Sequence, residues 1–378
     1  MKSRWWPTEG RAEPVRRRDA ARHLLRPARV RESLALAPQP FMRNSALAGM
    51  QAALTGVIAL PLVYLSPWSH LIGYASLGTL AALFGRFAQG TGRNRIVLAS
   101  GFWQTFAVLS VSAAIWLGAP FAVQLLLLAV LCGLFAVVAV QGKFGPPGPL
   151  IFIFAAGASM SEVQSWQAVL ERGAATAGVA ALAWVVCVLT EFIRQQARDG
   201  ISFPADPVRS PRQHLVVAMR IGSGALAAAC AAKVMGAHFP AWAAMGAVAV
   251  MQGAHLHTNM HRALQRMLGT VLGAGLVWLI LSCGPSVWVL IALIAIFQVV
   301  TEIVIGSNYA LGQILVTPMA LLMTYLASHG EAASAQLVPE RVLDTLVGAV
   351  VGMLLAVVCS TLEDRASLAR HLVSSEQN

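Results

Sequence analysis

Long apolar runs separated by short polar segments dominate the chain. Each run is continuously apolar over about 20 residues and does not alternate at a period of two, which predicts a membrane helix rather than a strand of a membrane barrel. Twelve such runs predict an all-α polytopic membrane protein. The predicted spans are 45–65, 70–87, 96–118, 121–141, 147–161, 173–193, 213–235, 239–256, 267–283, 286–305, 308–327 and 342–362.

Composition agrees with this fold class. Hydrophobic residues make up 57% of the 378 positions and charged residues only 11%, whereas soluble domains carry about a quarter charged residues. The net charge of +11 could indicate a nucleic-acid partner, but eleven of the 27 lysines and arginines precede Asn44 and most others fall in short loops. Basic loops are what membrane topology requires, so we predict a lipid bilayer and no nucleic acid as partner.

The distribution of basic residues also predicts an orientation. With a cytoplasmic N-terminus, 23 of the 27 lysines and arginines fall in cytoplasmic segments, while the outer loops 66–70, 118–120 and 283–286 carry none. We therefore expect both termini in the cytoplasm. The first apolar run is long enough to be an anchor rather than a cleavable signal.

The chain repeats itself at an offset of 168 or 169 positions. Tyr74 matches Trp242, and the pair Glu171-Arg172 matches Glu340-Arg341. Because charged residues are scarce, the matched pair predicts two tandem six-helix halves, and six being even makes them parallel repeats. The predicted domains are a basic cytoplasmic segment (1–44), a first membrane half (45–193), a cytoplasmic linker (194–212), a second membrane half (213–362) and a cytoplasmic tail (363–378).

The segment "HRALQRMLGTVLGAG" (261–275) places Arg262 and Arg266 four residues apart on one face of a helix that enters the membrane. One interpretation is a topology anchor; the other is a cytoplasmic collar that attracts anions, aided by Arg93 and Arg95. Small residues favour close helix packing in membranes. The residues assigned to packing are Gly269, Thr270, Gly273, Gly348 and Gly352.

Charged residues within the spans are candidates for proton coupling. Glu302 lies inside a span, where an ionised carboxylate is costly unless it is paired or faces water. Arg220 is either its counter-ion or reaches back to the interface. The segment "ERVLDT" brings Glu340, Arg341 and Asp344 to the outer end of the last span, as a second coupling cluster or as a helix-entry ion-pair cluster.

Prolines interrupt two spans at corresponding positions of the predicted halves. The segments are "GPPGPLIFIF" (145–154) and "LVTPMALL" (315–322), the second containing Thr317. Paired helix breaks indicate a substrate site near the midplane, and proline kinks tolerated for packing are the alternative.

Other chemistries find little support. The five cysteines lie in apolar runs without metal-ligand spacing, and His255, His257 and His261 have no carboxylate or cysteine partners nearby. No phosphate-binding GxxxxGK[ST] loop and no nucleophile–base arrangement occurs. We therefore predict no metal, no cofactor and no enzymatic activity.

The segment "FPAWAAMGAVAVMQGAHLHTNMHRALQRMLGTVLGAG" (239–275) resembles the signature of the fusaric-acid-resistance and aromatic-acid-exporter family. The segments "NYALGQILVTP" (308–318) and "ERVLDTLVGAVVG" (340–352) resemble later motifs of that family. The resemblance covers about 210–362. The family is distantly similar to plant aluminium-activated malate transporters, and its longer members carry a large soluble domain where this chain has only the linker.

The resemblance implies a bacterial inner-membrane exporter of aromatic carboxylic acids and related organic anions, driven by the proton motive force. It leaves open a periplasmic adaptor protein and a homo-oligomer as partners. We expect anions to pass a polar seam that includes Gln252, Asn308 and Thr317. Trp242 either stacks on an aromatic ring or belongs to the interfacial aromatic belt. A passive organic-anion channel and a non-transporting membrane scaffold are the alternative functions.

Overall fold

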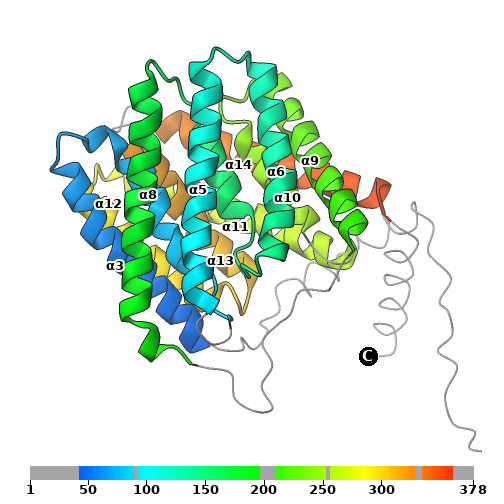
Figure 1. Cartoon of the computed structure of the whole chain (residues 1–378). Coiled ribbons are helices and arrows are strands. Elements are labelled where there is room, and N and C mark those ends of the chain that lie inside the picture. Colours follow the sequence, from blue (N-terminus) through cyan, green and yellow to red (C-terminus); the bar gives the residue numbers. More distant parts are fainter. Residues whose placement is uncertain (1–41, 89–91, 196–209, 253–255, 328–333, 361–378) are drawn as a thin grey trace, which may run out of the picture.

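The computed structural model describes residues 42–88, 92–195, 210–252, 256–327 and 334–360. Within these ranges the chain forms twelve α-helices and no strand. The long helices run side by side in one bundle (Figure 1). The predicted tail, most of the predicted N-terminal segment and most of the predicted linker lie outside the described residues.

Nine helices of the described part are long and apolar enough to cross a membrane. They are α3 (Met42–Tyr64), α5 (Gly92–Trp116), α6 (Phe121–Gln141), α8 (Trp166–Leu189), α9 (Pro211–Val234), α11 (Leu256–Ser282), α12 (Val287–Val304), α13 (Tyr309–Ala327) and α14 (Ser334–Val358). The prediction of an all-helical, multi-pass membrane protein is confirmed.

Three of the predicted spans contain helices too short to cross a bilayer alone, because a span needs about 20 residues. They are α4 (Ile72–Thr79), which continues as a 3₁₀ turn over Leu80–Leu83, α7 (Leu150–Ala158) and α10 (Ala241–Met251). The runs 70–87, 147–161 and 239–256 were predicted as full spans because they are apolar throughout.

Backbone geometry, not polarity, ends the segment that contains α4. Phe84 is extended and Gly85 has a φ of +69°, a region that glycine enters without steric cost.

The predicted break at Pro318 does not occur. Helix α13 continues through Pro318 from Tyr309 to Ala327. Proline has no backbone N–H, so the carbonyl of Ile314 lacks its usual helical donor. A Cβ on Gly273 of α11 would lie 2.7 Å from that carbonyl oxygen, so the backbone of α11 covers this point of α13.

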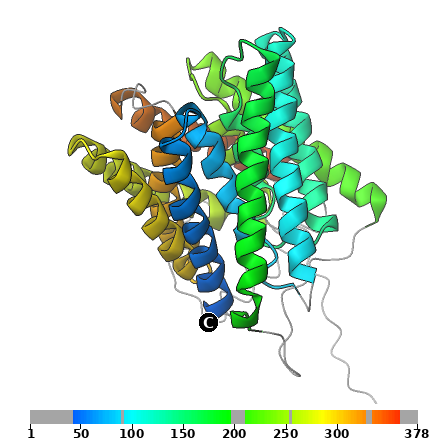
Figure 2. The ribbon, with the colours of Figure 1, turned by 60° about the vertical axis from the view of Figure 1, so that its left-hand side comes forward.

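The first six helices and the last six are interleaved. Helix α3 packs on α12, and α6 packs on α9. Figure 2 shows α3 between α12 on one side and α8 on the other. The short helices α4 and α10 pack on α8 and α14 respectively, and α5 and α11 pack on the same two helices. Helices about 168 positions apart in the chain therefore make similar contacts: α4 and α5 pack on α8, as α10 and α11 pack on α14.

Small residues allow the closest helix contacts of the second half. A Cβ on Gly269 would lie 2.5 Å from the Cβ of Gln313, so α11 and α13 touch at this point. A Cβ on Gly348 would lie 2.2 Å from the carbonyl oxygen of Ala243, and one on Gly352 would lie 2.8 Å from the Cα of Ala247. Helices α10 and α14 are therefore in backbone contact, which only glycine permits at these positions.

Candidate functional site

Arg266 lies inside the bundle rather than in a cytoplasmic loop. Helix α11 begins at Leu256, so the segment expected to precede the span 267–283 is helical, and Arg266 is 2% exposed. Its Nη1 donates to the Tyr309 hydroxyl at 3.3 Å and to Gln313 Oε1 at 3.4 Å, and its Nε has no hydrogen-bond partner within the described part of the chain. Arg262, one turn earlier, is half-buried. The expectation that both arginines form a surface collar is therefore wrong for Arg266.

Arg341 is the second buried arginine of this region. It is 1% exposed, and its guanidinium carbon lies 5.0 Å from the centre of the Trp242 ring. Arg341 interacts electrostatically with Arg266, Asp344 and Tyr309. Its Nε and Nη1 have no hydrogen-bond partner among the described residues. Burying unpaired guanidinium N–H groups is costly, so this arrangement needs an explanation other than packing.

Together these side chains form one cluster, which we call the arginine site. Helices α10, α11, α13 and α14 contribute its members, which are Trp242, Arg266, Tyr309, Gln313, Arg341 and Asp344. Among the described residues, α10, α11 and α14 also carry buried polar atoms without a hydrogen-bond partner, as other helices do: Gln252 Nε2, Asn259 Oδ1, Thr270 Oγ1, Asp344 Oδ2 and Thr345 Oγ1. The cluster holds the two guanidinium groups and the Asp344 carboxylate, with the Glu340 carboxylate close to Asp344. Guanidinium groups with free N–H donors suit an anion.

Trp242 is buried and does not belong to an interfacial belt. It is 6% exposed, and its ring stacks on Phe239 with centroids 4.8 Å apart. Its other neighbour is the guanidinium of Arg341. Trp242 thus lies beside the arginine site, and its stacking on a substrate ring stays a prediction.

Glu302 is paired with Arg86, at the end of the predicted span 70–87. The carboxylate of Glu302 accepts a short hydrogen bond from Arg86 Nη1, and both side chains are 5% exposed. Arg86 follows the 3₁₀ turn after α4, whereas Glu302 lies near the end of α12. The counter-ion of Glu302 is thus Arg86 rather than Arg220, which lies half-buried on α9.

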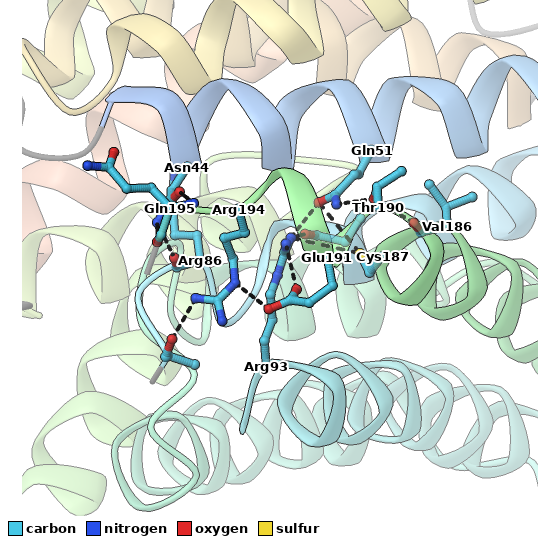
Figure 3. A network of polar contacts seen from close by, with 12 residues as sticks. Asn44, Gln51, Arg86, Arg93, Val186, Cys187, Thr190, Glu191, Arg194 and Gln195 are labelled. Atoms are coloured by element: carbon cyan, nitrogen blue, oxygen red, sulfur yellow. Dashed lines mark hydrogen bonds and ion pairs between the residues drawn. The ribbon is translucent and has the colours of Figure 1, made fainter. Parts of the chain in front are cut away.

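Around this pair, a polar network joins the ends of α3, α5 and α8 (Figure 3). Arg93 is fully buried and donates to Gln51 Oε1, whose Nε2 donates to Thr190. Glu191 lies 3.7 Å from Arg93 Nη1 and accepts from Arg194 Nε at 2.6 Å. Arg93 is therefore enclosed rather than part of a surface collar, while Arg95 is exposed. The arginines of this network form ion pairs, Arg86 with Glu302 and Arg93 and Arg194 with Glu191. Nε of Arg86 and Nε and Nη1 of Arg93 nevertheless also lack hydrogen-bond partners among the described residues.

The remaining predicted seam residues do not line one path. Asn308 caps α13, because its Oδ1 accepts from Ala310 N at 2.8 Å and from Leu311 N at 3.2 Å. Thr317 donates to Gln313 O within its own helix, and it is fully buried. Gln252 ends α10, where a Cβ on Gly148 would lie 3.7 Å from its Oε1. The structure brings Gln252 to the first-half loop but leaves Asn308 and Thr317 in helix-internal contacts.

Two histidine–glutamate pairs contain the glutamates that repeat along the chain, Glu171 and Glu340. His238 Nδ1 lies 3.2 Å from Glu340, and His70 Nε2 lies 3.5 Å from Glu171. Glu340 also accepts hydrogen bonds from the backbone N–H groups of His238 and Phe239. Because these backbone groups directly precede α10, the Glu340 carboxylate fixes the start of that helix.

The described residues hold no group of three metal-ligating side chains. His255 lies outside them, and the side chain of His257 is not described. Sequence reasoning missed Tyr309 and Gln313 of the arginine site, and Gln51 and Asn44 of the polar network. A polar side chain within an apolar run was the available signal for Gln51 and Gln313.

Comparison with known proteins identifies the second half of the chain. Residues 226–355 match the family model described as fusaric acid resistance protein-like. The resemblance predicted from the sequence is thus confirmed over this segment. It contains Trp242, Arg266 and Arg341, that is, every arginine of the arginine site.

One curated relative adds a second match. The chain is 35% identical over 140 residues to the uncharacterized membrane protein YvaC of Bacillus subtilis (strain 168). This match covers 37% of the chain and 22% of YvaC, so the chain spans about a fifth of the length of that relative. No solved structure shows a significant match.

Proposed function

We propose that this protein exports aromatic carboxylic acids and related organic anions across the bacterial inner membrane. The observation that carries the proposal is the burial of Arg266 and Arg341 with guanidinium N–H groups that lack acceptors. Ionisable groups buried among membrane helices are functional candidates by default. Guanidinium groups bind carboxylates with charge-assisted, often bidentate hydrogen bonds.

Aromatic surfaces beside the two arginines support an aromatic substrate. Trp242 lies under Arg341, and the hydroxyl of Tyr309 contacts Arg266. A ring that carries a carboxylate could contact both kinds of group at once, with its carboxylate on the guanidinium and its face on an aromatic side chain. The fusaric acid resistance protein-like match supports the same substrate class.

Among the candidate coupling residues, Asp344 is the one we assign to the site. Glu302 is held by Arg86 and Glu340 by backbone N–H groups, whereas Asp344 Oδ2 has no hydrogen-bond partner. Asp344 interacts electrostatically with Arg341 and replaces a bound anion as its counter-charge when the site is empty. A proton on Asp344 increases the positive charge of the site and therefore strengthens anion binding.

The mutual strengthening of proton and anion binding determines which driving force can support export. Because proton and anion binding favour each other, a pH gradient alone would move them in the same direction, which for an acidic exterior is inward. Export is therefore driven by the electrical component of the proton motive force, which requires that the anion crosses without the proton of Asp344. An inside-negative potential favours outward movement of one negative charge by about 2.3 kcal/mol per 100 mV.

The arrangement we propose is two parallel six-helix repeats with both termini in the cytoplasm. The matching packing of α3 on α12 and of α6 on α9 supports the repeats, and the basic loops support the orientation. Under this orientation the network of Arg86 and Arg93 faces the cytoplasm. The exposed Arg95 and half-buried Arg262 then attract anions at that surface.

Flux measurements in liposomes test the proposal. The purified chain is reconstituted, and radiolabelled 4-hydroxybenzoate uptake is followed at pH 7.5 under a potassium diffusion potential, with protein-free liposomes as the blank. We expect saturable accumulation that follows the potential and is accelerated by unlabelled substrate on the opposite side. Flux without this counterflow acceleration would indicate a passive channel instead, and no flux with several aromatic acids would indicate a scaffold.

Two carboxylate variants refine that experiment. Asp344→Asn leaves the site with an additional positive charge, so we expect half-saturation at a lower substrate concentration and slower turnover. Glu162→Gln serves as the matched control, because Glu162 is an exposed carboxylate outside the arginine site. Equal kinetic changes in both variants would contradict the assignment of Asp344.

A further inference from the structure

The constellations at the ends of α4 and α10 repeat four side-chain types in the same contacts. Arg172 lies over the Tyr74 ring at 5.0 Å, and Arg341 lies over the Trp242 ring at 5.0 Å. A histidine–glutamate pair accompanies each of them. Thr176 and Thr345 also match, four residues after each arginine.

The first constellation satisfies its own polar groups. Arg172 donates to the backbone carbonyl oxygens of Ser161 at 3.3 Å and Glu162 at 2.6 Å. The Tyr74 hydroxyl lies 3.2 Å from the Ser161 hydroxyl. Thr176 Oγ1 donates to backbone oxygens of Tyr74 and Arg172. Oxygen acceptors supplied by the chain thus already surround Arg172.

The second constellation leaves several of its polar groups without a hydrogen-bond partner among the described residues. Arg341 is almost completely buried, yet its Nε and Nη1 lack acceptors, and so does the hydroxyl of Thr345. Asp344 stands where the first constellation has Ala175, which adds a carboxylate to the second copy only. The two constellations therefore share their arrangement of side chains, but only Arg172 has oxygen acceptors supplied by the chain.

We infer that Arg341 and Thr345 form a single carboxylate-binding subsite, and that its counterpart at Arg172 and Thr176 is permanently closed by the Ser161–Glu162 backbone. The ligand is a planar monocarboxylate whose two oxygens accept from Arg341, as the two carbonyl oxygens accept from Arg172. Trp242 contacts the ring of the ligand at its edge or face. This inference rests on the proposed transport of aromatic carboxylates and assigns the carboxylate to one of two matching arginines.

Direct binding measurements test this asymmetry. The full chain in detergent is titrated with 4-hydroxybenzoate by isothermal calorimetry, and Arg341→Gln is compared with the matched variant Arg172→Gln. A charged hydrogen bond contributes about 1.5–3 kcal/mol, so Arg341→Gln should weaken binding at least about tenfold. Arg172→Gln should change it by less than about twofold. Equal losses in both variants, or unchanged binding in Arg341→Gln, would overturn the inference.

A variant that is expected to bind 4-hydroxybenzoate more tightly makes the test independent of misfolding. Asp344→Asn removes the carboxylate that competes for Arg341, so it should bind 4-hydroxybenzoate more tightly than the unmodified chain at pH 7.5. Tighter binding cannot result from damage to the fold and would support the inference. Weaker or unchanged binding by an Asp344→Asn chain that keeps the Tm of the unmodified chain would overturn it. If Arg341→Gln binds normally while liposome flux persists, transport stands and only the subsite is wrong. If neither binding nor flux occurs, both proposals fail.

Discussion

Arg86 and Glu302 lie 216 positions apart in the chain and form a buried ion pair. The pair joins the segment after α4 to the end of α12, next to the contact between α3 and α12. A Cβ on Gly49 of α3 would lie 3.0 Å from the Cβ of Glu302, so the backbone of α3 passes directly over the pair. The first and second halves of the chain are thus held together by a buried ion pair as well as by packing of α3 on α12.

Loss of one partner of this pair should destabilise the protein strongly. Removing one charge of a buried pair leaves the other uncompensated and costs about 3–5 kcal/mol. Glu302→Gln should therefore lower the Tm in detergent clearly. The exchanged pair Arg86→Glu with Glu302→Arg should recover part of the loss. No recovery in the double variant would mean that contacts other than the charge pair dominate at this position.

Contact between α10 and α14 depends on the absence of a side chain at residue 348. Gly348→Ala places a Cβ within 2.2 Å of the carbonyl oxygen of Ala243, so the helices must move apart, at a cost of about 1–3 kcal/mol. Gly275→Ala on α11 is the control, since a Cβ there meets nothing within 4 Å. We expect a lower Tm for Gly348→Ala and an equal or higher Tm for Gly275→Ala, where alanine favours the helix.

Asn44 connects the start of α3 to two other segments. Its Nδ2 donates to the carbonyl oxygens of Arg86 and Gln195, and its Oδ1 accepts from Gln195 N at 2.8 Å. Asn44→Ala leaves these backbone groups without their partner, and each such loss costs about 1–3 kcal/mol. The neighbouring exposed Arg43 provides the control variant, Arg43→Ala. Thermal unfolding that is equally affected in both variants would contradict the role of Asn44.

Transport should depend on the ring of Trp242 in a graded way. Trp242→Phe retains an aromatic face below Arg341, whereas Trp242→Ala removes it, so we expect flux of 4-hydroxybenzoate to fall more in the second variant. Trp278→Ala is a suitable control because Trp278 is 56% exposed on α11. If the flux of Trp242→Ala equals that of the control, Trp242 contacts no substrate and serves packing alone.

The sequence predicted the class of fold because composition determines it. Continuous apolar runs require helices in a bilayer, and nine of the twelve predicted spans contain helices long enough to cross. The short helices α4, α7 and α10 were not predicted, since an apolar run gives no information on where backbone torsions leave the helical region. The sequence indicated that Glu302 needs a partner, and Arg86 is that partner. Its identity depends on packing between α3, α12 and the end of the α4 segment, which no local pattern encodes.

The arginine site was predicted only in pieces. Sequence comparison within the chain found Trp242 and Arg341 as separate repeated residues, and the ring and guanidinium prove to be in contact. Arg266 was expected just before the span 267–283, in a cytoplasmic collar, yet α11 begins already at Leu256 and Arg266 is 2% exposed. Polarity indicates which residues prefer water, but only the tertiary structure decides which of them are enclosed.

The interleaving of α3 with α12 and of α6 with α9 also constrains how the protein is made. Helix α3 leaves the ribosome long before α12 exists, so the face that will contact α12 must first be covered by lipid or by the insertion machinery. The same holds for the buried Arg86, whose carboxylate partner is synthesised 216 residues later. Assembly therefore ends with a late docking step, and a chain interrupted in the linker should yield two fragments that acquire their final structure only together.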